Sequence, residues 1–216
     1  MPYCIAFDQT AGMFAVGGKN ALEIYAFPSC RRIWRKSLKC MAISWNTEAP
    51  VLYALCFDSD NQKSMRIITV NGILGTRIKK KPIPPSLYHL YPTVSPDGRL
   101  CVYDRSRGFE RFLICEEFEN NEERGEVEIT AGVPDRCAYT KDSRFIAIGT
   151  SAGSIGIYNC ETLKREPNLR EDTLPKHNLG QIAWNEDSSA LVCTSWVNQK
   201  DTICMDVHAF YVDWKT

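Results

Sequence analysis

Short apolar runs alternate with polar turns along most of the chain. The runs last about four to eight residues, are rich in Val, Ile, Leu, Phe and Cys, and are separated by turn residues such as Pro96 to Gly98. An amphipathic helix would instead place apolar residues at positions i, i+3, i+4 and i+7. Short apolar runs bounded by Gly, Pro and Asp are typical of β-strands joined by hairpins. The pattern therefore predicts an all-β fold.

One hairpin pattern recurs five times. Each copy has a first strand that ends in a large or apolar anchor, then a polar turn and a second apolar strand, as in "GQIAWNEDSSALVCTSW". The anchors are Phe7, Trp45, Val94, Tyr139 and Trp184, which are separated by 38, 49, 45 and 45 residues. A period of about 40–45 residues is that of one four-stranded propeller blade. We expect a single propeller-like domain over residues 1–216, with blades at roughly 1–36, 37–80, 88–130, 134–170 and 177–216; an unrelated sandwich or barrel is the alternative.

The copies resemble the WD-repeat family. The fourth contains "DSRFIAIGTSAGSIGIYN", with Tyr158-Asn159 where the family usually has Trp-Asp, and the third carries the family-like "VSPDGRL". The first has "LEIYAF" as a third strand, and His177 precedes the fifth copy much as the family's structural His does. The resemblance implies a WD-repeat-like β-propeller, although the family most often has seven blades.

Five blades leave the closure of the propeller open. They are compatible with a five-bladed ring, a homodimer that shares blades, or an open or incomplete propeller from a longer product. An open propeller would expose sheet edges and apolar blade faces, and both invite a partner chain. A partner protein that completes the propeller is therefore one expectation.

The composition limits the classes of partner and cofactor that the chain is expected to bind. With 26 basic and 26 acidic residues, the chain has no net charge to attract nucleic acid or a membrane surface. Most of the ten cysteines lie in apolar runs, and no signal segment opens the chain, so we expect reduced core thiols in a cytoplasmic or nuclear protein. No CxxC pair, Cys/His cluster or bilayer-length apolar run is present, so neither a metal, a cofactor nor a membrane span is expected.

Two charged segments stand out. Arg77 to Pro92, "RIKKKPIPPSLYHLYP", is predicted to be an extended connector between blades, with contact to an acidic partner or RNA as the functional alternative. Glu116 to Glu128, "EEFENNEERGEVE", has seven glutamates in thirteen residues and is predicted to be a mobile surface loop, with docking to a basic partner as the alternative.

The leading functional hypothesis is a non-catalytic scaffold for protein–protein interaction within a multiprotein complex. The three histidines have no carboxylate or Cys at catalytic spacing, and no Ser lies in a nucleophile elbow, so neither an enzyme nor a small-molecule substrate is expected. Exposed aromatic and Arg side chains give much contact energy per residue. The candidate partner-binding residues are Trp34, Arg105, Arg107, Phe118, Trp196 and Trp214.

The alternative is a catalytic regulator. The segments "YCIAFDQTAGMFAVGGKNALEIYAF", "GTSAGSIGIYN" and "HNLGQIAWNED" are similar to the membrane-anchored propeller that acts as guanine-nucleotide exchange factor for the small GTPase of vesicle-coat assembly. This resemblance implies that Lys19 and Asn20 contact the GTPase. The family's loop is longer and richer in Gly than this one, and its propeller has more blades. RNA binding by the basic segment is a third, weaker hypothesis.

Overall fold

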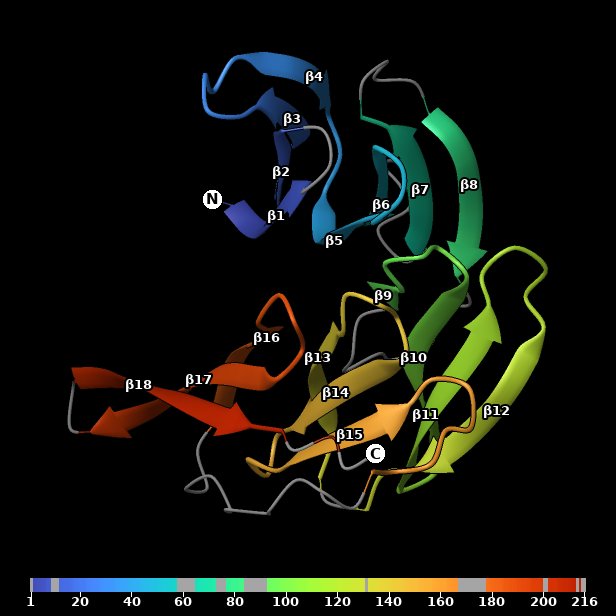
Figure 1. Ribbon diagram of the computed structural model, residues 1–216, viewed down its shortest axis with the longest axis vertical. Coiled ribbons are helices and arrows are strands. Elements are labelled where there is room, and N and C mark those ends of the chain that lie inside the picture. Colours follow the sequence, from blue (N-terminus) through green and yellow to red (C-terminus); the bar gives the residue numbers. More distant parts are fainter. Residues whose placement is uncertain are drawn as a thin grey trace. The chain divides into compact units, whose positions relative to one another are not determined.

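The computed structural model describes residues 2–8, 12–57, 65–72, 77–83, 93–130, 132–166, 178–199, 202–212 and 214. Within these ranges the chain is all β, with eighteen strands in five antiparallel sheets (Figure 1). The same ranges contain no helix that could cross a membrane. The all-β prediction is confirmed, and the sheets are called blades 1 to 5 in chain order.

Each blade is a meander in which strands that follow one another along the chain are paired. Blade 1 consists of β1 (Pro2–Asp8), β2 (Met13–Gly18), β3 (Leu22–Ala26) and β4 (Arg32–Lys36). Blade 2 consists of β5 (Cys40–Trp45), β6 (Val51–Phe57), β7 (Met65–Asn71) and β8 (Arg77–Ile83). Blade 3 consists of β9 (Thr93–Val94), β10 (Leu100–Arg107), β11 (Glu110–Glu117) and β12 (Glu123–Glu128).

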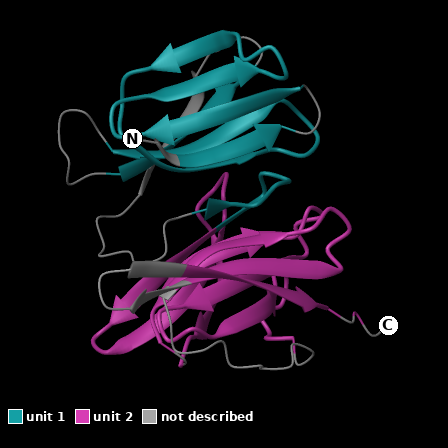
Figure 2. Ribbon diagram, turned by 90° about the vertical axis from the view of Figure 1, so that its left-hand side faces the viewer, with its two compact units in different colours: residues 1–87, 91–101 teal, residues 88–90, 102–216 magenta. Residues whose placement is uncertain are grey.

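Blades 4 and 5 show three strands each within the described residues. Blade 4 consists of β13 (Pro134–Tyr139), β14 (Phe145–Thr150) and β15 (Ile155–Asn159), and Arg165 adds a single bridge to Tyr158. Blade 5 consists of β16 (Asn178–Trp184), β17 (Ala190–Gln199) and β18 (Thr202–Tyr211). The chain divides into two compact units, residues 1–87 with 91–101 and residues 88–90 with 102–216 (Figure 2). Blades 1 and 2 lie in unit 1, and blades 4 and 5 lie in unit 2.

The five predicted anchors are structurally equivalent, because each lies at or next to the end of the first strand of its blade. Where the pairing of the first two strands is described, the anchor is always paired with the residue seven positions later. The pairs are Phe7 with Phe14, Trp45 with Leu52, Tyr139 with Ile146, and Trp184 with Leu191. This common register allows side chains to be compared position by position between blades.

A short polar turn fixes that register in blade 4. The Thr140 hydroxyl accepts a hydrogen bond from the Phe145 N–H at 3.0 Å and donates one to the Asp142 carboxylate at 2.6 Å. The Asp142 carboxylate also accepts the Arg144 N–H at 3.0 Å, and Ser143 has a positive φ of 61°. Such side chains replace backbone partners in tight turns. Blades 3 and 5 have the same arrangement around Asp97 and Asp187.

One segment predicted to be an extended connector and one predicted to be a mobile loop contain strands. Arg77–Ile83 is β8, the outermost strand of blade 2, so this part of the basic run is not a connector; residues 84–92 lie outside the described ranges. Glu116–Glu128 contains the end of β11, a turn and β12, the outermost strand of blade 3. An outermost strand faces solvent and has an unpaired edge, and charged residues are the usual occupants of such a strand. The sequence of such a strand therefore resembles that of a surface loop.

Most described cysteines belong to the cores. All nine are free, and six of them are buried, namely Cys40, Cys56, Cys101, Cys115, Cys160 and Cys193. The side chain of Cys204 lies outside the described residues. A hydrogen bond with Cys40, together with burial, raises the pKa of the Cys4 thiol well above its ordinary value. Cys4 is therefore protonated at neutral pH, and the thiols pack as small hydrophobic groups.

Candidate interaction surfaces

The same hydrogen bond joins neighbouring blades in both units. In unit 1 the Trp45 Nε1–H donates to the Ala6 carbonyl at 3.0 Å, and in unit 2 the Trp184 Nε1–H donates to the Ala138 carbonyl at 3.0 Å. Ala6 and Ala138 each stand immediately before the anchor of the preceding blade. Blades 2 and 5 thus turn their anchors toward the preceding blade, and blades 1 and 4 present their opposite faces to them.

Blade 1 exposes the face that blade 2 buries. Ala15, Leu22 and Ile24, which face blade 2, are completely buried in the shared core. On the other face, Ile5 and the anchor Phe7 are more than half exposed, whereas the equivalent residues of blade 2 pack against blade 1. The outer face of blade 1 is defined by Ile5, Phe7, Phe14, Tyr25 and Phe27.

The aromatic rings of this outer face form one continuous cluster. The ring centroid of Phe7 lies 5.5 Å from that of Phe14 and 5.9 Å from that of Phe27. The rings of Phe14 and Tyr25 are stacked, with their centroids 5.1 Å apart. Aromatic rings at these separations attract one another beyond simple burial. The cluster is therefore an ordered apolar platform.

Blade 5 exposes the face that corresponds to the buried side of blade 1, the side covered by blade 2. Val192 and Ala15 are equivalent because each lies eight residues after the anchor of its blade. Val207 and Leu22 are equivalent because each pairs with the residue ten positions after the anchor, Thr194 in blade 5 and Gly17 in blade 1. Val207 is 66% exposed, however, whereas Leu22 is 0% exposed. The outer face of blade 5 is defined by Val192, Met205, Val207 and Tyr211, all of which are exposed.

The two arginines predicted to bind a partner form ion pairs with glutamates of their own blade, blade 3. Arg107 forms a bidentate pair with Glu126, with both N–O distances at 2.7 Å, and its guanidinium lies 4.8 Å from the Phe112 ring centroid. Arg105 donates to Glu123 at 3.0 Å. Both arginines reach across β11 to β12, so they fasten the outermost strand to the blade while remaining partly accessible.

Arg105 also contacts Tyr103, whose hydroxyl donates to Glu116 at 3.1 Å. Burial, followed by the negative charge of Glu116, raises the pKa of Tyr103 to about 12. The predicted arginines therefore form part of a polar network that holds β10, β11 and β12 together.

The predicted aromatic contacts do not form one surface. Phe118 is only 2% exposed, and Trp214 stacks on Phe145 at 4.3 Å while its Nε1–H donates to the Ser188 carbonyl at 2.8 Å. Trp34 is half-buried against the core of unit 1. The side chain of Trp196 lies outside the described residues. Phe118 and Trp214 therefore serve packing within unit 2, where surface exposure had been expected.

The remaining predicted contacts, Lys19 and Asn20, are exposed in the turn between β2 and β3. The Gly18 N–H closes this turn on the Ala21 carbonyl at 2.9 Å. Sequence reasoning missed Phe27 and Phe109, which are exposed in turns. Their signal was an aromatic residue next to Pro28 or Gly108, inside a segment where polar residues are the rule.

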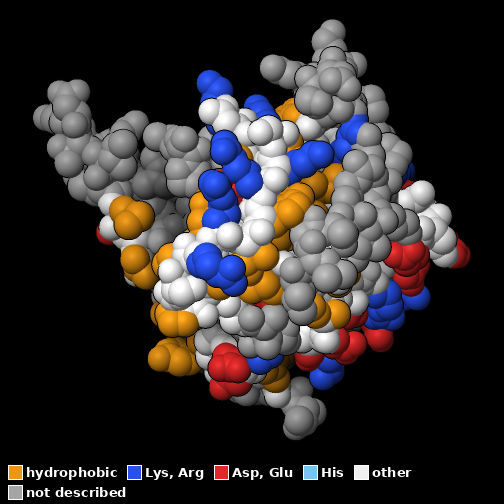
Figure 3. Space-filling view, turned by 90° about the horizontal axis from the view of Figure 1, so that it is seen from above, with side chains coloured by type: hydrophobic (Ala, Val, Ile, Leu, Met, Phe, Trp, Pro, Cys, Tyr) orange, Lys and Arg blue, Asp and Glu red, His pale blue; other side chains and the backbone are white. Residues whose placement is uncertain are grey.

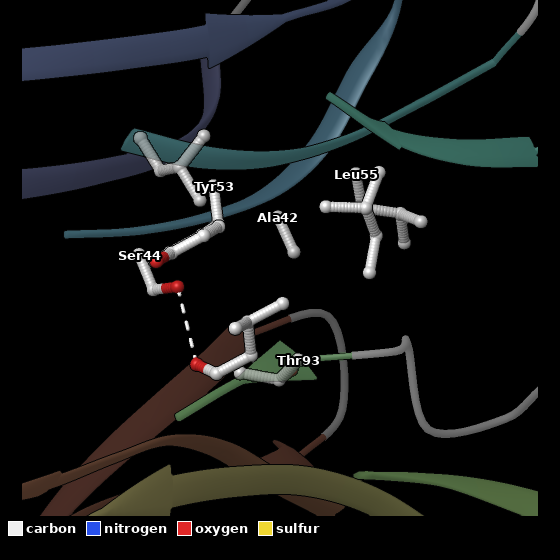
Figure 4. A pocket seen from close by; sticks show the side chains of 8 residues that line it. Ala42, Ser44, Tyr53, Leu55 and Thr93 are labelled. Atoms are coloured by element: carbon white, nitrogen blue, oxygen red, sulfur yellow. Dashed lines mark hydrogen bonds between the residues drawn. The ribbon is translucent and has the colours of Figure 1, made fainter. Parts of the chain in front are cut away.

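A hollow in unit 1 lies beside β5, β6, β7 and β9 (Figure 4). The Ser44 hydroxyl donates to the Val94 carbonyl at 3.3 Å across it. Its volume is about 10 Å³, which is room for one water molecule. Ligand pockets are larger by more than an order of magnitude. The hollow is lined by Ala42, Ile43, Ser44, Tyr53, Leu55, Ile67, Thr93 and Val94.

The described residues hold neither an accessible nucleophile at a Ser–His pair nor a cluster of metal ligands. Ser195 Oγ and His208 Nε2 lie 3.0 Å apart, but Ser195 is completely buried, so a substrate has no access to its hydroxyl. In the described part of the chain, no group of three His, Cys, Asp or Glu side chains is placed to hold a metal ion.

Consecutive meander sheets with a common register and a recurring inter-blade tryptophan bond are typical of a β-propeller fold. The chain is accordingly similar to the β-propeller domain of Cps50 (Swd1) from Myceliophteria thermophila, with a TM-score of 0.64 over 96% of this chain and 71% of that one. Sequence identity is 12%, so this likeness concerns the fold alone. No family model and no curated protein sequence matches the chain. The likeness to the exchange-factor propeller gains no support from these comparisons.

Proposed function

We propose that the protein is a non-catalytic scaffold of a multiprotein complex that binds its partners through the outer faces of blades 1 and 5. The observation that carries this proposal is the exposure of Val207 at a position where blade 1 has the fully buried Leu22. Clusters of exposed apolar side chains, unlike scattered ones, are typical of protein-binding surfaces.

The two faces are suited to β-structured partners. The outer face of blade 1 carries the anchor Phe7, whose counterparts Trp45 and Trp184 pack against a preceding blade. The outer face of blade 5 carries non-aromatic apolar side chains such as Val207 and Met205, as does the side of blade 1 that receives blade 2. Burial of one large apolar side chain contributes about 1.5–3 kcal/mol. A partner that covers either face therefore gains enough for stable binding.

The test is affinity purification of the tagged chain from its own cells, with stoichiometry measured by mass spectrometry. We expect a stoichiometric partner that is lost when the outer face of blade 5 carries Met205→Asp and Val207→Asp. The matched control is Asp206→Asn, because Asp206 is exposed on the same strand but points to the other side of it. Phe7→Asp tests the outer face of blade 1 in the same way.

The proposal fails if folded variants of both faces retain every partner of the wild-type chain. Circular dichroism of each purified variant separates lost binding from lost folding. Recovery of a small GTPase that is released by GTP and lost in Lys19→Ala would instead favour nucleotide exchange.

A further inference from the structure

The zero net charge of the chain conceals two oppositely charged units. Unit 1 has 13 Lys and Arg against 6 Asp and Glu, which is a formal charge of +7. Unit 2 has 13 Lys and Arg against 20 Asp and Glu, which is −7. Fields of this size attract oppositely charged partners to one part of a protein surface. A charged partner can therefore be recognised even though the protein as a whole is neutral.

The positive charge of unit 1 is concentrated on its outermost strands. Strand β8 carries Arg77, Lys79, Lys80 and Lys81. Strand β4 and the residue before it carry Arg31, Arg32, Arg35 and Lys36, which together are called the basic edge. All four side chains of the basic edge are exposed. Figure 3 looks down on unit 1 from the β4 side and shows Lys and Arg side chains gathered there, with hydrophobic side chains between them.

Strand β4 has an open edge as well as a charge. It is the last strand in the order β1-β2-β3-β4, so only one of its two edges is paired within the described residues. Its inner side is held firmly, because Ile33 and Trp34 pack against the core of unit 1. An anchored strand with an open row of N–H and C=O groups is a template for a further strand.

The paired side of β4 shows how the basic edge recognises a neighbouring strand. Arg35 is the direct cross-strand partner of Glu23 on β3, and its Nε lies 3.4 Å from Glu23 Oε1. The Nη1 of Arg32 lies 3.1 Å from the same oxygen. Two guanidinium groups therefore share one carboxylate across the strand pair. Arg31 and Lys36 form no ion pair with another described residue, so they remain available to carboxylates on the open side.

We propose that the open edge of β4 binds an acidic, extended segment of a partner protein as an added β-strand. The unpaired backbone groups of β4 supply the ladder, and the basic edge selects Glu and Asp side chains, as it does on β3. A nucleic acid would satisfy the charges but leave the backbone ladder unpaired. A basic or neutral strand would satisfy the ladder but not the charges. An acidic strand satisfies both.

The experiment measures the binding of a fluorescein-labelled nine-residue peptide of alternating Glu and Val to the full chain by fluorescence anisotropy at low salt. Lys36→Glu should weaken binding by about tenfold, because it places a like charge beside the peptide. Lys19→Glu makes the same change of charge in the same unit but lies in the β2–β3 turn. It should change affinity by less than about twofold.

A second peptide isolates the backbone contribution. N-methylation of alternate residues preserves the charge of the peptide but removes the N–H groups that pair with β4, so we expect its binding to be lost. Lys36→Gln guards against misfolding of the Glu variant and should give a smaller loss in the same direction.

Three results would overturn the proposal. The first is equal binding of the methylated and unmethylated peptides, and the second is an equal loss of affinity in Lys19→Glu and Lys36→Glu. The third is tighter binding of a labelled single-stranded RNA of the same charge. Since these readouts use β4 alone, they are independent of the outer-face variants Met205→Asp and Val207→Asp, so this inference and the scaffold proposal fail separately.

Discussion

Replacing Trp45 or Trp184 by Phe tests the inter-blade contact that recurs in the two units. Each indole donates one hydrogen bond of 3.0 Å to an alanine carbonyl of the preceding blade. Loss of such a bond costs about 1 kcal/mol, and the smaller ring leaves a cavity that costs about 1 kcal/mol more. We therefore expect each substitution to lower the free energy of unfolding by about 2 kcal/mol.

The assay is equilibrium urea unfolding followed by circular dichroism. The two sites lie in different units and share no partner, so the double variant should show the sum of the single effects to within about 0.5 kcal/mol. The matched control is Trp34→Phe, because the indole of Trp34 donates no hydrogen bond to a described residue. Equal costs for Trp34→Phe and Trp45→Phe would show that the inter-blade hydrogen bond is not the source of stability.

Two further substitutions test packing and ionisation. Gly72→Ala should lower the free energy of unfolding in urea by about 1–3 kcal/mol, because a Cβ there would lie 2.7 Å from the rigid Trp45 ring. The control is Gly108→Ala, where a Cβ meets no atom within 4 Å but the φ is +66°. It should lower the free energy of unfolding by about 1 kcal/mol through backbone strain alone. A cost of Gly72→Ala no larger than that of the control would contradict the packing argument. The raised pKa of Tyr103, about 12 against an ordinary 10.0, means that the folded chain keeps a proton that the unfolded chain loses between these values. The urea midpoint should therefore fall as pH rises from 10 to 12, and Tyr103→Phe should remove that part of the slope; an unchanged slope would refute it.

Local chemistry made much of the fold predictable. The anchors could be found because each stands beside a polar turn, and the turns are built by side chains within a few residues of one another, as Thr140 and Asp142 show. The spacing of the anchors then indicated the blade length. All of these signals depend on short stretches of sequence, so no tertiary information was needed to recognise them.

The outermost strands and the exposed faces could not be predicted in the same way. β8 and β12 are strands because a neighbouring strand pairs with them, although their own residues are charged. Likewise, the alternation of side chains assigns Phe7 and Ala6 to opposite faces of β1 but does not say which face another blade covers. Phe118 and Trp214 were expected at the surface but pack within unit 2. Local sequence could not show this, because their burial depends on residues that are distant in sequence.

The charge of the chain shows why the division into units matters for function. A sum over all residues gives zero and argues against any charged partner, but screening at physiological salt limits the reach of an exposed charge to about one Debye length, about 8 Å. A partner therefore responds to the charges around its own binding site and not to the sum. The +7 and −7 of the two units must therefore be considered separately. A scaffold built in this way can attract an acidic segment to the basic edge of β4 through charge while it holds another partner through the apolar outer faces. Because the first interaction is screened by salt and the second is not, raising the salt concentration should release partners of β4 first.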